Sequence, residues 1–269
     1  MTCDLPTRTE LTQRGRELRE RLGLSDSVHA SPTPGYDGLS DELVFGAIWS
    51  RPGLALDERM MSVLCVLAGL ERHALIKDYV EAALRLDIKP RAIQELFLQA
   101  SLYSGFASSE SACRLAQEVF DAQGVTADDD TGPDMSAQEL AELGAAKLVE
   151  LHGERGTLGY AAPDNPTTGP LYTLASAYGY GALWHRAGLT RRQRFICSVA
   201  TFTALGLEMQ VAKFAQSAER NDLTRSETVE VIMQVAPYCG FPRSLNALAL
   251  VDQNQPEYCT RPAPHGRLI

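Results

Sequence analysis

The side chains in this 269-residue chain that could perform chemistry recur in pairs at one constant separation, which we call the repeat offset. Arginine and tyrosine donate hydrogen bonds, so such pairs could hold negative charge that develops on a substrate. The predicted substrate-binding pairs are Arg59 with Arg194, Trp49 with Trp184, and Tyr103 with Tyr238. Arg51 and Arg186 also recur, but they stand in a turn, where an arginine commonly bonds the end of a helix. The constant spacing predicts two related versions of any site.

Titratable side chains near these donors could act as acids or bases. His73 and His185 are the only histidines inside the repeated segments, and neither has a histidine counterpart in the other copy. Glu208 lies in a weakly polar stretch, where an embedded carboxyl could have a raised pKa and donate a proton. Tyr79 could donate a hydrogen bond to a substrate oxygen. We therefore predict that His73, Tyr79, Glu208 and His185 are catalytic, although a lone histidine is often a surface or core residue.

The repeat runs without a gap through the matching segments. Gly46–Leu54 reappears as Gly181–Leu189, and Tyr103–Phe106 reappears as Tyr238–Phe241. Two copies are too few for a solenoid, so the period indicates duplication of a small domain. Because an ungapped offset leaves no place for an insertion, we expect residues 40–118 and 175–253 to superpose.

The hydrophobic periodicity is helical throughout, and it predicts an all-α fold. A charged amphipathic helix is expected over residues 7–22, and another helix over residues 136–152. Ser40 is the expected cap of the helix that begins the first copy, and Thr224 with Glu227 forms a capping box in the second. Ser108 or Ser109 is expected to open the last helix of the first copy.

We expect two tandem helical domains joined by a linker that contains one helix. The predicted boundaries are residues 1–125 for the first domain with its N-terminal helix, 126–170 for the linker, 171–255 for the second domain, and 256–269 for an irregular tail.

Charge and hydropathy exclude several classes of partner. Lysine plus arginine is 25 against 34 aspartate plus glutamate, which gives a net charge of −9. No basic stripe interrupts this acidic balance, so neither nucleic acid nor an anionic membrane is an expected partner. The N-terminus lacks the pattern of a signal peptide, and no apolar run is long enough to span a bilayer. We expect a cytoplasmic protein that binds a small molecule.

The six cysteines form no CxxC pair, which weakens a metal or thiol-redox interpretation. Cys65, Cys113 and Cys197 lie in apolar helical patterns, where small buried thiols are common. The few histidines are scattered. We therefore expect neither a metal nor another cofactor.

The quoted segments resemble the carboxymuconolactone decarboxylase family, which shares its all-helical fold with alkylhydroperoxidase D-like proteins. The family's W-x-R-P-G-L turn stands here as residues 49–54, its following arginine as Arg59, and its V-I-M-Q-x-A-x-Y-C-G-x-P segment as residues 231–242. This resemblance implies a cofactor-free lyase that acts on a lactone of aromatic catabolism. It also implies a homo-oligomeric ring, which a tandem chain would build as a dimer or trimer.

The chain departs from the family at the decarboxylase pattern E-E-L-K-x-H. This pattern falls on residues 74–79 and 209–214, where Tyr79 and Phe214 replace the histidine. The paired cysteines of the peroxidase branch are also missing from these helices, which disfavours thiol peroxidase chemistry. We therefore expect an altered substrate.

Loss of carbon dioxide from a carboxylated lactone leaves an enolate, which needs hydrogen-bond donors and then an acid that protonates carbon. The expected pocket contains Arg59, His73 and Tyr79, with His185, Arg194 and Glu208 joining from the second copy or a neighbouring chain. Two alternatives remain open. One is a biosynthetic enzyme that cyclises, isomerises or oxidises a polyketide-like compound, and the other is a non-catalytic binding or scaffold protein.

Overall fold

The computed structural model describes residues 6–24, 31–128, 132, 134–154 and 165–253. Every regular element in these ranges is helical, which confirms the predicted all-α fold. The first half contains α1 (Arg8–Leu22), α2 (Tyr36–Leu39), η1 (Ser40–Trp49), α3 (Leu56–Gly69), α4 (His73–Arg85), α5 (Pro90–Ser104) and α6 (Phe106–Gln123). The second contains α7 (Ala137–His152), α8 (Gly169–Leu174), η4 (Ala175–Ala182), η5 (Leu183–His185), α9 (Arg191–Leu205), α10 (Glu208–Ala218), η6 (Glu219–Asn221), α11 (Arg225–Cys239) and α12 (Phe241–Gln253). No described helix is both long and apolar enough to cross a bilayer.

The starts of the helices follow the repeat offset. η1, α3, α4, α5 and α6 begin at residues 40, 56, 73, 90 and 106, and η4, α9, α10, α11 and α12 begin at 175, 191, 208, 225 and 241. Each start in the second set therefore follows its counterpart at the same separation as Arg194 follows Arg59. The Thr224–Glu227 capping box is present at α11, as predicted.

Two predicted helix starts were wrong. In both cases the helix begins earlier, directly after a glycine with a positive φ. The helix expected after Ser40 already begins at Tyr36, because Gly35 takes a φ of 83° and turns the chain into the helix. From Ser40 the chain continues as a π-helix. The helix expected at Ser108 or Ser109 begins at Phe106, where Gly105 with a φ of 95° separates it from α5.

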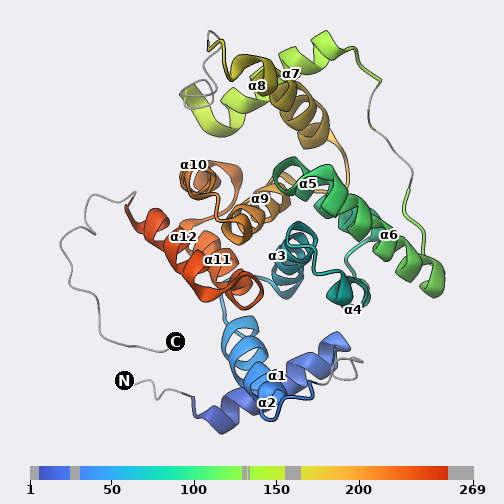
Figure 1. Ribbon diagram of the computed structural model, residues 1–269, viewed down its shortest axis with the longest axis vertical. Coiled ribbons are helices and arrows are strands. Elements are labelled where there is room, and N and C mark those ends of the chain that lie inside the picture. Colours follow the sequence, from blue (N-terminus) through green and yellow to red (C-terminus); the bar gives the residue numbers. More distant parts are fainter. Residues whose placement is uncertain (1–5, 25–30, 129–131, 133, 155–164, 254–269) are drawn as a thin grey trace.

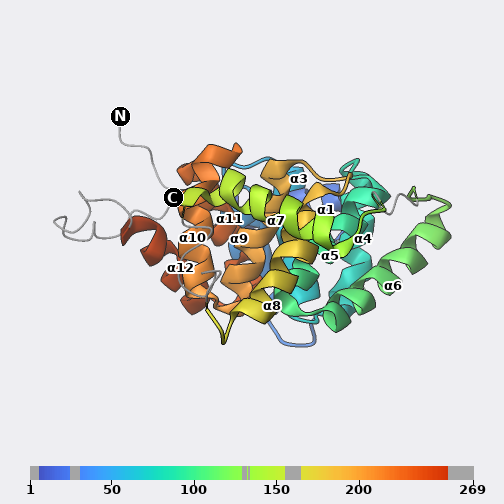
Figure 2. The same ribbon diagram turned by 90° about the horizontal axis from the view of Figure 1, so that it is seen from above.

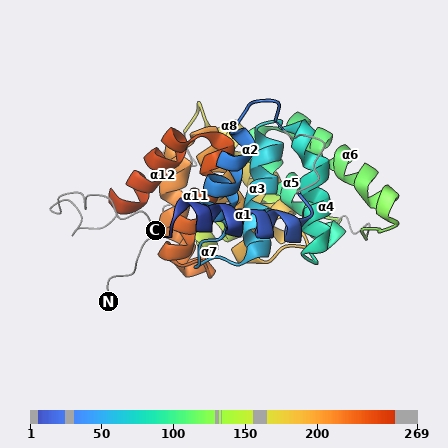
Figure 3. The same ribbon diagram turned by 90° about the horizontal axis from the view of Figure 1, so that it is seen from below.

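Figure 1 shows α1 and α2 at one end of the molecule and α7 and α8 at the other, with α3, α5, α9 and α11 between them. Figure 2 shows α7 and α8 across one end, and Figure 3 shows α1 and α2 across the opposite end. α1 packs against η1, and α7 packs against η4. The helix expected in a linker therefore covers η4 in the same way that α1 covers η1.

Glycines permit these two helix crossings. A Cβ on Gly15 of α1 would lie 1.8 Å from the backbone oxygen of Asp41, and one on Gly144 of α7 would lie 2.3 Å from that of Ser176. Both distances are far below van der Waals contact. The crossings are thus as close as two backbones allow.

The two halves interlock at the centre. α3 contacts α9, α11 contacts α3, and α5 contacts α9. The apolar cores follow this exchange, because Cys197 of α9 belongs to the core of the first half and Val66 of α3 belongs to the core of the second. Cys65 and Cys197 are fully buried, as the apolar patterns predicted, whereas Cys113 is partly exposed.

At one end of this interface, Arg192 of α9 bridges a carboxylate from each half. Its Nε lies 2.7 Å from Oε1 of Glu58 in α3, and its Nη2 lies 2.8 Å from Oε1 of Glu227 in α11. Hydrogen bonds from Arg192 lower the pKa of Glu227 to about 2, against the effect of burial, and Thr224 adds to the shift.

We expect Arg192→Gln to lower the free energy of unfolding at pH 7 by about 1 to 2 kcal/mol, because water screens a pair that is about a quarter exposed. The folded pKa of Glu227 lies below its ordinary value of 4.5. Its contribution is therefore present above pH 4.5 and lost as the pH falls towards 2. Denaturant unfolding of both proteins at pH 7 and pH 3 measures this, and a difference that is equally large at both pH values would contradict it.

Candidate functional site

The repeated arginines lie in buried ion networks that join the two halves. Arg59 of α3 donates to Glu230 of α11 at 2.8 Å and to Gln234 at 3.0 Å. Arg194 of α9 donates to Gln99 of α5 at 2.7 Å and lies 3.5 Å from Glu95. Every residue of one network has its counterpart in the other at the repeat offset.

Each network is closed by backbone oxygens and by a second arginine. Arg59 also donates to the carbonyl oxygen of Arg51, and Arg194 donates to that of Arg186. Burial lowers the pKa of both guanidinium groups. Burial would raise the pKa of Glu230, but hydrogen bonds from Arg51 and Arg59 leave it below its ordinary value. The terminal nitrogens of these arginines thus bind protein groups, and their predicted contact with substrate stays a prediction.

One pocket of about 310 Å³, which we call the Tyr79 pocket, lies where α4 of the first half meets the end of α11. Its lining comprises Arg19, Leu24, Tyr36, Asp37, Ser40, Val44, Phe45, Leu67, Arg72, Leu75, Asp78, Tyr79, Pro237 and Tyr238. Trp49 donates its indole hydrogen to the Tyr238 hydroxyl at 2.8 Å, and this hydroxyl lies 2.9 Å from that of Tyr79. Whichever tyrosine donates in this contact, one hydroxyl hydrogen remains for a ligand.

The two tyrosines of this pocket remain protonated over the ordinary pH range. Burial raises the pKa of Tyr79 to about 12, although the hydrogen bond with Tyr238 opposes the shift. Burial also raises the pKa of Tyr238 well above its ordinary value. They can therefore donate hydrogen bonds, but they release a proton reluctantly.

A second pocket of about 250 Å³, the Trp184 pocket, lies where α10 of the second half meets the end of α5. Its lining comprises Leu102, Tyr103, Tyr172, Ala175, Gly179, Tyr180, Trp184, Phe202, Gln210, Lys213 and Phe214. Apart from Trp184, each of these residues stands at the repeat offset from a described lining residue of the Tyr79 pocket. Each pocket receives a tyrosine from the other half, Tyr238 in one and Tyr103 in the other.

Hydrogen bonding differs between the two pockets. Ser198 donates its only hydroxyl hydrogen to the carbonyl oxygen of Arg194, so it accepts from Tyr103 at 2.9 Å. Gln99 donates to the same tyrosine at 3.1 Å, and burial raises the pKa of this tyrosine. The indole N–H of Trp184 lowers the pKa of Tyr103 less than Ser198 and Gln99 do. It is buried and makes no hydrogen bond of normal geometry with the described residues.

The charges of the two pockets also differ. Asp37 and Asp78 line the Tyr79 pocket together with Arg19 and Arg72. The described lining of the Trp184 pocket contains no carboxylate, and Lys213 stands there at the position of Asp78. The charged side chains in the described lining of the Trp184 pocket are therefore positive, whereas those of the Tyr79 pocket include both signs.

A histidine that the sequence analysis did not select lies beside the Trp184 pocket. His152, the last residue of α7, is only 1% exposed. Its Nε2 lies 3.3 Å from the hydroxyl of Tyr180, and its ring packs 4.7 Å from that of Phe214. The sequence offered one signal for it, since Leu143-Gly144 resembles Arg14-Gly15 and places this helix over the second half.

Three predicted catalytic residues lie elsewhere. His73 and Glu208 are exposed first residues of α4 and α10. Glu208 accepts a hydrogen bond from Asn246 at 3.2 Å. Nδ1 of His185, in η5, lies 2.9 Å from the backbone oxygen of Tyr180, so it binds the end of the preceding helix η4. None of the three is among the described lining of either pocket, and only Tyr79 of the predicted catalytic set lies there.

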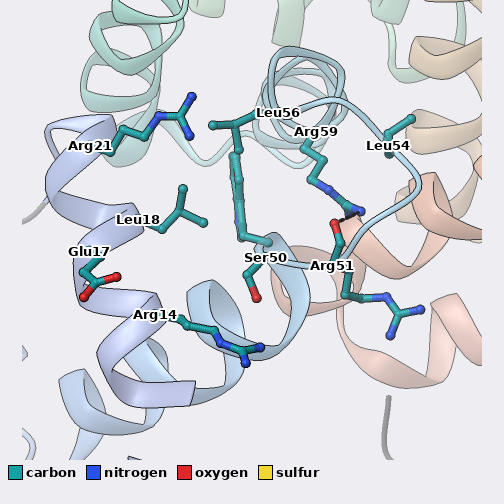
Figure 4. A pocket seen from close by; sticks show the side chains of 10 residues that line it. Arg14, Glu17, Leu18, Arg21, Ser50, Arg51, Leu54, Leu56 and Arg59 are labelled. Atoms are coloured by element: carbon teal, nitrogen blue, oxygen red, sulfur yellow. Dashed lines mark hydrogen bonds between the residues drawn. The ribbon is translucent and has the colours of Figure 1, made fainter. Parts of the chain in front are cut away.

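A third hollow, of about 450 Å³, is an open groove between α1 and the turn after η1. Figure 4 shows Arg14, Leu18 and Arg21 projecting from α1 towards it, while Arg59 reaches the backbone oxygen of Arg51. Arg14 and Arg21 are exposed to water, which weakens their effect on a reacting group. No three histidine, cysteine or carboxylate side chains converge as metal ligands anywhere in the described ranges.

Comparisons with known proteins agree with the sequence resemblance. The sequence model of the carboxymuconolactone decarboxylase family matches residues 170–253. The chain is 30% identical over 90 residues to a 4-carboxymuconolactone decarboxylase of Acinetobacter baylyi, an alignment that covers 34% of this chain and 67% of that protein. It is 26% identical over 88 residues to a nitrosuccinic acid decarboxylase of Metarhizium robertsii, covering 33% and 62% of the two chains. With its all-helical fold, the chain belongs to the carboxymuconolactone decarboxylase family.

Proposed function

We propose that the chain is a cofactor-independent decarboxylase of a small carboxylic acid, and that the acid reacts in the Trp184 pocket. The observation that carries this proposal is the indole N–H of Trp184, which is buried in the pocket lining and makes no hydrogen bond of normal geometry with the described residues. An unsatisfied buried donor costs about 1 to 3 kcal/mol. An acceptor atom on a ligand would remove that cost.

The names of the relatives narrow the chemistry. One acts on 4-carboxymuconolactone and the other on nitrosuccinic acid. In both substrates the electron pair of the broken carbon–carbon bond can pass towards an electron-accepting group, a conjugated carbonyl or a nitro group. We propose a substrate of this class, whose developing oxyanion accepts a hydrogen bond from Trp184.

The pocket suits such a substrate in charge and size. Lys213 brings a positive charge to a lining whose described residues include no carboxylate, which favours an acid. Phe202 and Phe214 supply apolar walls, where a hydrogen bond to a developing charge is stronger than in water. The cavity of about 250 Å³ corresponds to about eight water molecules at liquid density, enough for a small acid.

We propose that the Tyr79 pocket arose from the same ancestral site by duplication of the domain. The common spacing of the helix starts, the ion networks and the pocket linings supports this origin. Asp37 and Asp78 offset the positive charges of Arg19 and Arg72 in the Tyr79 pocket, whereas no carboxylate stands in the described lining of the Trp184 pocket. The exchange of Tyr103 and Tyr238 between the halves makes each pocket depend on both.

Trp184→Phe tests the proposal, because it removes the N–H and keeps an aromatic ring. We expect about a 10²-fold loss of kcat, the effect usual for one oxyanion donor. The assay measures carbon dioxide released from carboxylated lactones and α-nitro acids. Trp49→Phe is the matched variant, and a smaller loss is expected there because Trp49 already donates to Tyr238. An equal or larger loss in Trp49→Phe would place the reaction in the Tyr79 pocket instead.

A biosynthetic enzyme that retains the pocket but catalyses another reaction is the second candidate. The replacement of the family's histidine by Tyr79 and Phe214 favours it. In that case compounds of the same class would bind and change without releasing carbon dioxide, which product analysis by mass spectrometry would detect.

A further inference from the structure

His152 is held in an apolar environment by specific polar contacts. The rings of Phe214, Tyr180 and Phe195 lie 4.7, 5.9 and 6.3 Å from its ring centre. Its Nδ1 lies 2.9 Å from the hydroxyl oxygen of Ser217. Burial of an imidazole is costly unless its nitrogens are hydrogen-bonded, so these contacts define how the side chain can act.

The number of hydrogens that Ser217 can donate fixes the direction of its hydrogen bond with His152. Ser217 has one hydroxyl hydrogen and donates it to the carbonyl oxygen of Lys213 at 3.1 Å. Its oxygen must therefore accept from Nδ1–H of His152. The proton that the imidazole gains or loses is then the one on Nε2, which lies 3.3 Å from the Tyr180 hydroxyl.

We propose that Ser217, His152 and Tyr180 form a proton relay that protonates the substrate carbon in the Trp184 pocket. Tyr180 lines the pocket and would touch the substrate, whereas His152 acts through Tyr180, and Ser217 fixes the tautomer. The relay rests on the decarboxylation proposed above.

The step balances in protons and electrons. The carbon–carbon bond to the carboxylate breaks, carbon dioxide leaves, and the electron pair stays on the carbon and its accepting group. Tyr180 gives its hydroxyl proton to that carbon. The imidazolium of His152 returns a proton from Nε2 to the Tyr180 oxygen, and one proton taken up by the protein from solvent completes the cycle. The net reaction consumes one proton and releases one carbon dioxide.

The first half lacks all three groups of the relay. The fold therefore does not require them. At the repeat offset, Phe45 stands opposite Tyr180 and Ala82 stands opposite Ser217. α1, which covers η1 as α7 covers η4, ends at Leu22 and is followed by Gly23 where α7 carries His152. The three groups are therefore found together in one half and are absent together in the other.

Two variants that copy the first half test the relay in the full-length protein. Tyr180→Phe and Ser217→Ala place Phe and Ala where Phe45 and Ala82 stand in the first half, so both should fold. We expect Tyr180→Phe and His152→Gln each to lower kcat on the order of 10²-fold with KM changed less than threefold. The double variant Tyr180→Phe/His152→Gln should have a kcat no lower than that of the less active single variant, because the groups act as a unit. Tyr178→Phe, an exposed neighbour on η4, is the matched control and should keep its activity.

Nitrogen NMR of histidine provides a readout that does not depend on activity. Neutral His152, identified by the signal lost in His152→Gln, should carry its proton on Nδ1, and Ser217→Ala should shift the proton towards Nε2. A neutral Nε2–H tautomer in the unmodified protein would overturn the relay, as would multiplicative losses of kcat in the double variant or an effect confined to KM. If no acid of the panel releases carbon dioxide, the proposed function fails, while the tautomer still decides whether the relay geometry exists.

Discussion

Glu95→Ala is expected to lower the free energy of unfolding by about 3 to 5 kcal/mol, because it leaves buried guanidinium groups without this carboxylate. Glu95 is 1% exposed. Its Oε1 lies 2.8 Å from Arg186 and 3.1 Å from Arg91, and its Oε2 lies 3.5 Å from Arg194. Removal of this one carboxylate therefore leaves three positive charges that repel one another in a site that water reaches poorly.

Denaturant unfolding followed by circular dichroism measures this loss. Glu110→Ala is the matched control, because Glu110 also pairs with an arginine on a helix of the first half but is exposed. We expect its effect to stay within about 0.5 kcal/mol. Equal effects of the two variants would show that the buried network contributes no more than a surface ion pair.

The part of the fold that could be predicted from the sequence rests on local signals. Thr224 followed by Glu227 marks the start of α11, because a capping box satisfies backbone donors whatever the tertiary contacts. The prediction that a helix begins after Ser40 was wrong, because the helix begins where Gly35 adopts a positive φ. The sequence does not reveal which glycine adopts that conformation. The π-helix from Ser40 has no signal in the sequence that we recognise.

The candidate site was predictable only where it is built from repeated residues. Trp184, Tyr103, Tyr79 and Tyr238 recur or match a motif, and all four line a pocket. The arginines recur for another reason, since Arg59 and Arg194 join the two halves. A recurring polar residue therefore indicates a shared structural environment, and burial must be known before a chemical role follows.

His152 was missed because the helix that carries it was assigned to a linker. Gly144 of α7 corresponds to Gly15 of α1, but the two stand closer together in the sequence than the repeat offset. The longer connection between α7 and η4 makes up the difference, so the match falls outside the repeat offset. Packing of α7 on η4 brings His152 to Tyr180, a contact between distant positions that no local pattern predicts.

Gly15→Ala is expected to lower the free energy of unfolding by about 3 kcal/mol or more, at the upper end of the cost of overpacking. The new Cβ would lie 1.8 Å from the backbone oxygen of Asp41 and 2.7 Å from its carbonyl carbon. These are backbone atoms, so no side chain can turn aside, and α1 must move away from η1. Thermal unfolding of the variant should show a clearly lower Tm.

Gly38→Ala separates this steric effect from the intrinsic preference of a helix for alanine. Gly38 lies in α2, and a Cβ there would meet nothing within 4 Å. The substitution should be neutral or stabilise by up to about 1 kcal/mol, because it reduces the freedom of the unfolded chain. Gly144→Ala should repeat the loss in the second half, since its Cβ would lie 2.3 Å from the backbone oxygen of Ser176. If Gly15→Ala and Gly144→Ala were as stable as Gly38→Ala, the close crossings of α1 with η1 and α7 with η4 would be refuted.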